Sequence, residues 1–286
     1  MYGMKLALGT LGGVGLSDAE QLPLIKAAGF DGVFFLWRRG YDVSGFRQRC
    51  DEVGLAIQSV HAPFGGMAKM WLPESEARCA IDELTECALA TRQVGAPIMV
   101  CHAFIGFKDH TPTKDGIENF RKVVDKAREC GIKIAFENTE GREYLDALMD
   151  AFSDDDTVGF CYDTGHELCY NRGERMLSHY GDRLLVTHIN DNLGVKDFSG
   201  EITFLDDLHL LPFDGIADWE RIARELTRCP LPEYLTFELT TVSKPGRCEN
   251  DKYARLPLTE YLAEAYARAV RVATLVKREI ANKTNI

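Results

Sequence analysis

The chain has 286 residues, 45% of them hydrophobic, and a formal net charge of −11. This is enough for one large core, so we expect a single domain over residues 1–286. The acidic balance gives no support for a nucleic-acid-binding surface, and no apolar run approaches the roughly 18 residues that cross a membrane. Nine cysteines without a C-x-x-C pair, and no signal-peptide pattern, favour the cytoplasm.

Short apolar segments along the chain are typical of buried β-strands. They lie at residues 5–8, 32–37, 55–60, 97–101, 132–136, 158–162, 184–189 and 234–237. These runs lack the alternation of a half-exposed sheet, which favours parallel strands covered by helices. Glycines that suit left-handed helix C-caps precede four of the strands, namely Gly29, Gly54, Gly95 and Gly131.

A helix is expected after each strand. The helices lie at residues 18–28, 43–53, 75–94, 116–130, 143–152, 172–180, 218–228 and 258–278. The first opens with Ser17-Asp18-Ala19-Glu20, the pattern of a capping box. Eight strand–helix pairs in strict alternation predict a single (β/α)8 TIM barrel. Residues 190–215 have no clear regular structure, and a loop of that length is usually functional.

Polar side chains follow nearly every predicted strand. Because TIM-barrel active sites lie at the C-terminal ends of the strands, we expect these residues to meet at one mouth. They are Trp37, Arg38, His61, His102, Glu137, Asp163, His166, His188, Asp191, Asp207, His209 and Glu238. Such a set can hold a divalent ion: oxygen-rich ligation favours Mn²⁺, Mg²⁺ or Co²⁺, and additional imidazoles favour Zn²⁺.

Each residue also has an ordinary structural explanation. A lone buried histidine is more often a hydrogen-bonded core residue than a ligand, and Asp163 is open to being the N-cap of the next helix. Glu137 and Glu238, however, would each need a separate partner if buried, so a shared metal site is the simpler hypothesis. The glycines of residues 9–15 give only a weak dinucleotide-binding pattern, because no acid follows the second strand to bind a ribose.

Taken together, these segments resemble the xylose isomerase-like TIM barrel superfamily, specifically its sugar phosphate isomerase/epimerase branch, over nearly the whole chain. The carrying segments are His61-Ala-Pro, Phe136-Glu137-Asn138, Asp163-Thr-Gly-His166, His188-Ile-Asn-Asp191, His209 to Gly215 and Phe237-Glu238. The resemblance implies four metal ligands, Glu137, Asp163, His188 and Glu238. It also implies substrate contacts by His166 and Glu143. Gly194 replaces an arginine that ketose epimerases carry, so no particular sugar follows.

A second resemblance concerns the endonuclease IV-like apurinic endonucleases of the same superfamily, which hold three zinc ions. Their nine ligands are matched in type and order by His61, His102, Glu137, Asp163, His166, His188, Asp207, His209 and Glu238. This makes His61, His102, His166, Asp207 and His209 candidate ligands of additional metal ions. The long loop, however, carries Asp191, Asp197, Glu201, Asp206, Asp207 and Asp214 against Lys196 alone, whereas a nuclease needs basic groups for phosphates. We therefore favour the isomerase.

The favoured hypothesis is a metal-dependent sugar isomerase or epimerase with Mn²⁺ as the first choice of ion. Glu137 and Glu238 would be the catalytic residues, one removing the proton beside a polarised carbonyl and the other returning it through an enediolate. The expected substrate-binding residues are His61, His102, Glu143, His166, Asp191, His209 and Trp37, with Phe64, Trp71 and Phe213 as further apolar walls.

Other properties of the enzyme stay open at this level. Dehydration of a polyol ketone would use the same proton abstraction. No glycine-rich phosphate-binding turn is visible near the last two strands, so the sequence does not support a phosphorylated substrate. The expected partner is a small carbohydrate, neither nucleic acid nor a membrane, and a homo-oligomer is allowed.

Overall fold

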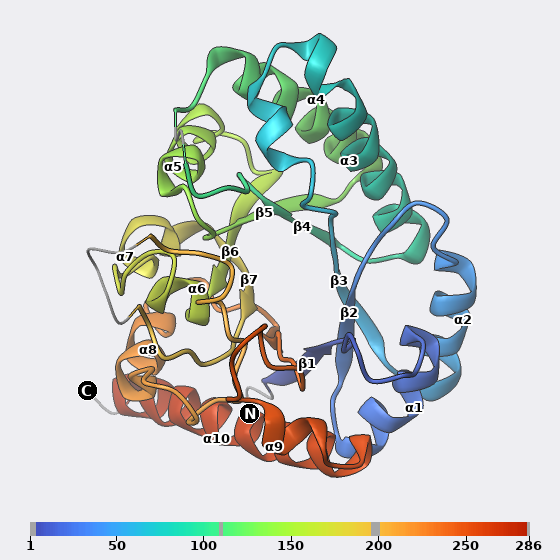
Figure 1. Ribbon diagram of the computed structural model, residues 1–286, viewed down its shortest axis with the longest axis vertical. Helices are drawn as coiled ribbons and strands as arrows, with labels where there is room; N and C mark the ends of the chain where they lie inside the picture. The colour runs from blue at the N-terminus through green and yellow to red at the C-terminus, as the bar shows by residue number, and fades with distance from the viewer. Residues whose placement is uncertain (1–3, 109–110, 196–200, 285–286) are drawn as a thin grey trace.

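Eight parallel strands form a barrel in the computed structural model, which describes residues 4–108, 111–195 and 201–284 (Figure 1). The strands are β1 (Lys5–Gly9), β2 (Gly32–Leu36), β3 (Ala56–His61), β4 (Ile98–His102), β5 (Lys133–Glu137), β6 (Val158–Asp163), β7 (Leu184–His188) and β8 (Tyr234–Phe237). They are adjacent in sequence order, and β1 pairs with β8. A parallel bridge between Ile189 and Phe237 joins the two remaining edges, where Ile189 N donates to Thr236 O at 2.8 Å. The predicted (β/α)8 barrel is confirmed.

Helices surround the barrel, and several begin and end where the sequence predicts. They are α1 (Asp18–Ala28), α2 (Val43–Val53), α3 (Glu74–Val94), α4 (Lys114–Cys130), α5 (Arg142–Ala151), α6 (Thr164–Leu168), α7 (Leu177–Tyr180), α8 (Trp219–Leu226), α9 (Asp251–Ala254) and α10 (Leu258–Thr284), with 3₁₀ turns η1 (Met67–Trp71) and η2 (Gly181–Arg183). The four C-cap glycines are left-handed, with φ of 118°, 72°, 75° and 68°. At the capping box, Ser17 N donates to Glu20 Oε2 at 2.8 Å.

The prediction of a helix over residues 172–180 is wrong in its first half. Arg172 and Gly173 have φ of 54° and 76°, which lies in the left-handed region and prevents a right-handed helix. Only α7 forms there, while the short helix α6 begins directly after β6. Lys196 and Asp197, which we weighed in the long loop, lie outside the described residues.

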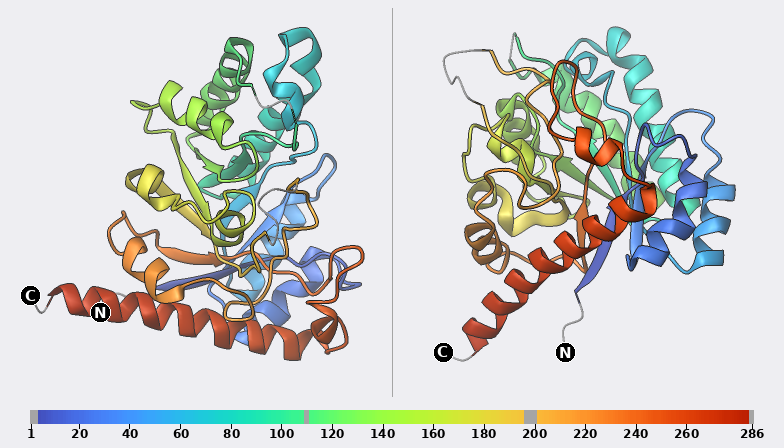
Figure 2. Two further views of the ribbon diagram at one scale, coloured as in Figure 1. Left: turned by 60° about the vertical axis from the view of Figure 1, so that its left-hand side comes forward. Right: turned by 60° about the horizontal axis from the view of Figure 1, so that its bottom comes forward.

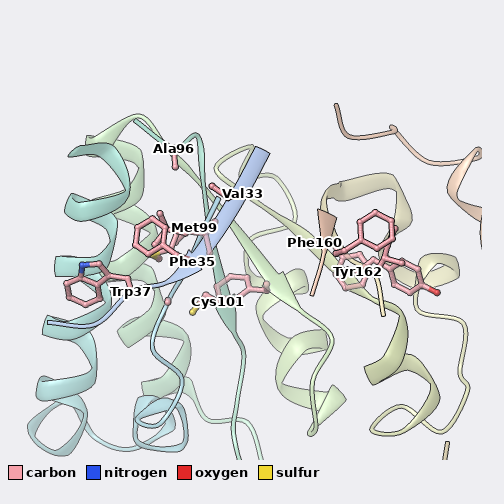
Figure 3. Packing of buried hydrophobic residues seen from close by; sticks show 14 of the residues in the cluster. Val33, Phe35, Trp37, Ala96, Met99, Cys101, Phe160 and Tyr162 are labelled. Carbon is pink, nitrogen blue, oxygen red and sulfur yellow. The ribbon is translucent and has the colours of Figure 1, made fainter. Parts of the chain in front are cut away.

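The hydrophobic core lies mainly between the barrel and its helices (Figure 3). Successive strand residues point to opposite faces, so β2 sends Phe35 outward, where it stacks on Tyr41 at 4.6 Å. Phe34 faces the barrel axis and stacks on His188 at 4.7 Å. Trp37 has the parity of Phe35 and belongs to the core cluster. A smaller cluster of Val100, Ala135, Cys161 and Val186 forms separately from it.

The connections after the strands gather at the end of the barrel opposite the first described residues (Figure 2). All nine cysteines are free thiols. Among the described residues, no helix combines the length and the apolar character needed to cross a bilayer.

Candidate metal centre

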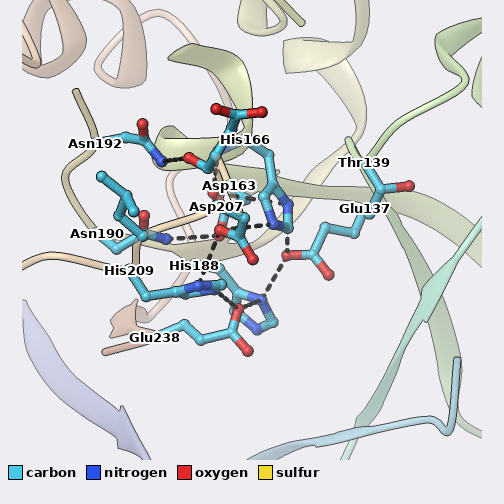
Figure 4. A network of polar contacts seen from close by, with 12 residues as sticks. Glu137, Thr139, Asp163, His166, His188, Asn190, Asn192, Asp207, His209 and Glu238 are labelled. Carbon is cyan, nitrogen blue, oxygen red and sulfur yellow. Dashed lines mark hydrogen bonds and ion pairs between the residues drawn. The ribbon is translucent and has the colours of Figure 1, made fainter. Parts of the chain in front are cut away.

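Four of the predicted ligands meet at this mouth. Glu137 ends β5, Asp163 ends β6, His188 ends β7, and Glu238 directly follows β8. One ligand atom from each lies within 4.8 Å of those of the other three (Figure 4). Strand pairing brings two of them together, because Asp163 is in register with His188.

Glu137 is the centre of the cluster and is fully buried. His188 Nδ1 lies 2.8 Å from its Oε1 atom. Its other oxygen, Oε2, is 3.3 Å from Nε2 of both His61 and His102. Glu137 therefore belongs to three groups of candidate ligands: the four above, one formed with His61 and His102, and one formed with Cys161 and His188.

Asp163 has the helix-capping role that the sequence left open, and it also faces the cluster. Its Oδ1 accepts from His166 N at 2.6 Å at the start of α6, and its Oδ2 accepts from Asn190 Nδ2 at 2.8 Å. Because each carboxylate oxygen has two lone pairs, the capping bond leaves a position for a cation. The two explanations for Asp163 are compatible.

A further group consists of Asp163 at the end of β6, His166 in α6 and His209 in the connection after β7. Asp207 lies beside it, with Oδ1 2.9 Å from His209 Nδ1 and 3.5 Å from His166 Nε2. His209 adopts a left-handed φ of 47°, which is uncommon for a side-chain-bearing residue. Glu238 Oε2 lies 3.4 Å from His209 Nε2 and 3.0 Å from His188 Nδ1, so it joins this group to the first.

The ionisable side chains of the mouth perturb one another strongly. Burial raises the pKa of Glu137, but the charge of His188 and hydrogen bonds from His102 and His188 outweigh it and hold the pKa well below its ordinary value. Burial lowers the pKa of His166, yet the charges of Asp163 and Asp207 raise it to about 10. Burial raises the pKa of Asp163 to about 6. Protonated imidazoles thus balance carboxylates here, a charge that a cation can replace.

The donor set fits a divalent cation. Buried carboxylates at such short range repel one another unless positive charge lies between them. Several buried polar atoms of the cluster have no hydrogen-bond partner among the described residues, including His188 Nε2 and His166 Nδ1. Three carboxylates and one imidazole suit Mn²⁺, Mg²⁺, Co²⁺ or Zn²⁺ by the chemistry of their atoms.

A hollow of about 540 Å³ opens beside the cluster. His61, His209 and Glu238 line its inner part, and Phe34 and Phe64 provide aromatic walls. The rim carries residues of the β1, β2 and β8 ends, namely Thr10, Leu36, Arg38, Ser243 and Lys244. This volume falls in the range of small-molecule sites.

Three predicted substrate contacts lie elsewhere. Trp37 is only 6% exposed and packs in the core, because it directly follows β2 and the alternation of that strand turns its side chain away from the axis. Asp191 is fully buried, and its carboxylate accepts hydrogen bonds from Phe213 N, Ala217 N and Trp219 Nε1. It anchors the β7–α8 connection rather than facing the mouth.

Glu143 lines a different hollow, together with Tyr170 and Arg172. Of the other aromatic walls that we predicted, Phe64 lines the hollow beside the cluster. Trp71 is buried and donates to Ala103 O, and Phe213 packs on Trp219.

Some residues of the mouth were not predicted. Phe34 stacks on His188, and Asn190 orients Asp163. Asn138 fixes the β6 end, since its Oδ1 accepts from Asp163 N at 2.8 Å. Asn138 and Asn190 each follow a predicted ligand in the sequence, which is the signal that could have identified them. Lys244 lies on the loop after β8 and has no comparable signal.

A family model described as xylose isomerase-like TIM barrel matches residues 22–264. The chain belongs to this family. An uncharacterized protein of Sinorhizobium fredii is 32% identical over 196 residues, which is 62% of this chain and 59% of that relative. The chain thus matches less than two thirds of that relative's length.

Solved structures share the fold at low sequence identity. A structure of L-ribulose 3-epimerase is 16% identical, with a TM-score of 0.73 over 98% of this chain and 97% of that one. A structure of the IolI protein with a bound zinc atom is 17% identical, with a TM-score of 0.70 over 96% of this chain and 99% of that one.

Proposed function

We propose that the protein is a divalent-metal-dependent sugar isomerase or epimerase. The observation that carries this proposal is the convergence of Glu137, Asp163, His188 and Glu238 within 4.8 Å at the end of the barrel. The family and its structural neighbours support it, since one neighbour is an L-ribulose 3-epimerase and another holds zinc. By its donor set the site suits Mn²⁺ first, with Zn²⁺, Co²⁺ and Mg²⁺ as alternatives.

The chemistry follows from two opposed carboxylates. When bound, the ion would polarise a sugar carbonyl and acidify the neighbouring C–H bond. Glu137, at the end of β5, and Glu238, after β8, approach the cluster from different sides of the barrel (Figure 4). One removes the proton to give an enediolate and the other returns a proton to the opposite face, which inverts the carbon. His61 and His209, on the same hollow, are placed to orient hydroxyl groups.

Loss of either carboxylate tests these roles. We expect Glu137→Gln and Glu238→Gln each to lower turnover of ketopentoses or ketohexoses by at least about 100-fold, because each removes one proton-transfer group. In D₂O, the product of the unaltered enzyme should carry deuterium at the inverted carbon. Glu86→Gln, an exposed carboxylate that pairs with Arg39, is the matched control and should keep full activity. Full activity in Glu137→Gln, or no deuterium in the product, would contradict the mechanism.

A second candidate is a three-zinc phosphodiesterase acting at abasic DNA sites. Two of the further groups, His61 with His102 and Glu137, and Asp163 with His166 and His209, favour it. Against it, Lys244 Nζ lies 3.4 Å from Asp207 Oδ2, so an ammonium already compensates a carboxylate that a third ion would need. Inductively coupled plasma mass spectrometry separates the candidates. About one equivalent of metal per chain supports the isomerase, whereas three of zinc together with cleavage of abasic DNA supports the nuclease.

A further inference from the structure

Two cations line the hollow beside the metal centre, Arg38 at the end of β2 and Lys244 after β8. The chain carries a net charge of −11, and many of its described lysines and arginines pair with carboxylates on the surface. Arg38 forms no ion pair within the described parts of the chain. A cation left unpaired at the rim of a substrate-sized hollow is available to a ligand.

Arg38 is held in place by its neighbours. Its guanidinium lies over the ring of Tyr41, 5.7 Å from the centroid. Tyr41 is itself fixed, since its ring stacks on Phe35 and its hydroxyl donates to Asp18 Oδ2 at 2.7 Å. Asp18 also lines the hollow, but its carboxylate is engaged by this hydroxyl. The guanidinium is therefore supported on one side and open on the other.

Lys244 lies in a turn that several hydrogen bonds stabilise. Arg247 N donates to Lys244 O at 2.9 Å, and Gly246 has a φ of 77° that favours glycine. Ser243 Oγ donates to Asp251 Oδ1 at 2.7 Å, and Arg247 Nη1 donates to Leu205 O at 3.1 Å. The ammonium has Asp207 as one partner at 3.4 Å, and its three donors can serve further acceptors.

The hollow lined by Glu143 differs from this one in its charge. It also contains two arginines, Arg142 and Arg172, but four glutamates line it with them, Glu140, Glu143, Glu174 and Glu201. The hollow beside the metal centre instead has two cations, Arg38 and Lys244, against two carboxylates, Asp18 and Glu238, and Asp18 is engaged by Tyr41.

We propose that Arg38 and Lys244 form an anion-binding wall, so that the substrate is a sugar carrying a phosphate or a carboxylate group. This rests on the proposed function, because the sugar's carbonyl end would lie at the metal centre and its anionic group at the wall. It reverses the expectation drawn from the absence of a glycine-rich phosphate turn. Phosphate and carboxylate share the chemistry that both side chains recognise, namely charge-assisted hydrogen bonds.

The test measures binding of three unreactive polyols to the metal-loaded protein by calorimetry: ribitol, ribitol 5-phosphate and ribonate. We expect one of the two anions to bind at least about tenfold more tightly than ribitol, and which one identifies the anionic group. Arg38→Gln and Lys244→Gln should each remove most of this preference and leave ribitol binding unchanged. Glutamine is chosen because its amide can still donate to Asp207. Arg38→Lys should restore part of the preference, and Arg39→Gln, whose side chain pairs with Glu86 instead, is the matched control.

The outcomes separate this proposal from the proposed function. Equal binding of the three polyols would overturn the anion-binding wall, and so would a preference that survives both glutamine variants, since the anion would then contact the metal directly. Because these polyols have no carbonyl, their binding does not depend on turnover. An enzyme that epimerises neutral ketoses without any anion preference would keep the proposed function and lose the wall. One that binds the anions through Arg38 and Lys244 but turns over no sugar would keep the wall and lose the function.

Discussion

Asp191 shows how one buried carboxylate fixes the loop beside the barrel mouth. It receives hydrogen bonds from Asn192 N, Phe213 N, Ala217 N and Trp219 Nε1 at 2.8–3.2 Å. Asp191→Ala would leave these donors buried without an acceptor, so we expect the free energy of unfolding to fall by about 3 kcal/mol. Urea denaturation followed by circular dichroism measures this. Asp182→Ala, at an exposed position, should change it by less than about 0.5 kcal/mol. If Asp191→Ala leaves the free energy of unfolding unchanged, the Asp191 carboxylate does not anchor the loop and is free to contact a substrate.

Comparison of Asp191 with Asp163 shows which features of a single residue the sequence can predict and which it cannot. Both are acids near the end of a predicted strand, and the sequence pattern predicted that both belong to the site. Asp163 ends β6 itself and faces the barrel axis, whereas Asp191 lies beyond β7 and turns into the connection that follows. The direction in which a loop side chain points depends on contacts with residues far along the chain, and no local sequence pattern encodes it. For Trp37 the parity of β2 would have sufficed, since Phe35 already faces the helices.

At the scale of elements, a buried ion pair joins α6 to α8. Glu167 is fully buried, and its Oε1 accepts from Arg221 Nη2 at 2.7 Å. Burial raises the pKa of Glu167, which the charge of Arg221 opposes. Arg221→Met would leave this buried carboxylate without a cationic partner, and we expect a loss of about 3 kcal/mol in unfolding free energy at pH 8.

The pH dependence of that loss has a definite sign. Without Arg221 the folded-state pKa of Glu167 rises further above its unfolded value, so the protonated form is favoured in the folded state. Stability of the variant is then fully present below the unfolded pKa of about 4.3 and falls as pH rises through the folded pKa. The difference in unfolding free energy between Arg221→Met and the unaltered protein should therefore become smaller near pH 4. Adding Glu167→Gln to Arg221→Met should make the difference independent of pH; if the single variant is already independent of pH, Glu167 does not carry the effect.

Element boundaries were predictable where a residue imposes a backbone conformation. The glycines at positions 29, 54, 95 and 131 end their helices in the left-handed region, as expected. The same reasoning gave a wrong prediction for the segment after β6. Arg172 is left-handed without being glycine, and Asn171, just before it, is held by Asn138. Here a tertiary hydrogen bond outweighs local helix propensity.

At the scale of the whole molecule, the proposed metal ligands Glu137, Asp163, His188 and Glu238 connect four consecutive strands, β5 to β8. A bound ion would link half of the barrel and stabilise the folded state by about 2.7 kcal/mol at a concentration a hundredfold above its dissociation constant. We expect chelation to lower the melting temperature and to raise amide hydrogen exchange in β5–β8 more than in β1–β4. Equal exchange in both halves would contradict ligation by Glu137, Asp163, His188 and Glu238.

Proton release connects the same binding event to the charge balance of the mouth. The pKa values of His188 and His209 lie well above their ordinary value. Burial lowers both, but interactions with Cys161, Glu137 and Glu238 outweigh it at His188, and interactions with Asp207 and Glu238 outweigh it at His209. A cation must displace these protons, so metal affinity should fall as pH decreases. Calorimetry at one pH in buffers of different ionisation enthalpy counts the protons released, and we expect about one or more per ion. His179→Gln, which alters an exposed histidine paired with Glu174, should leave the count unchanged. A binding enthalpy independent of buffer would mean that the ion does not replace imidazole protons and binds elsewhere.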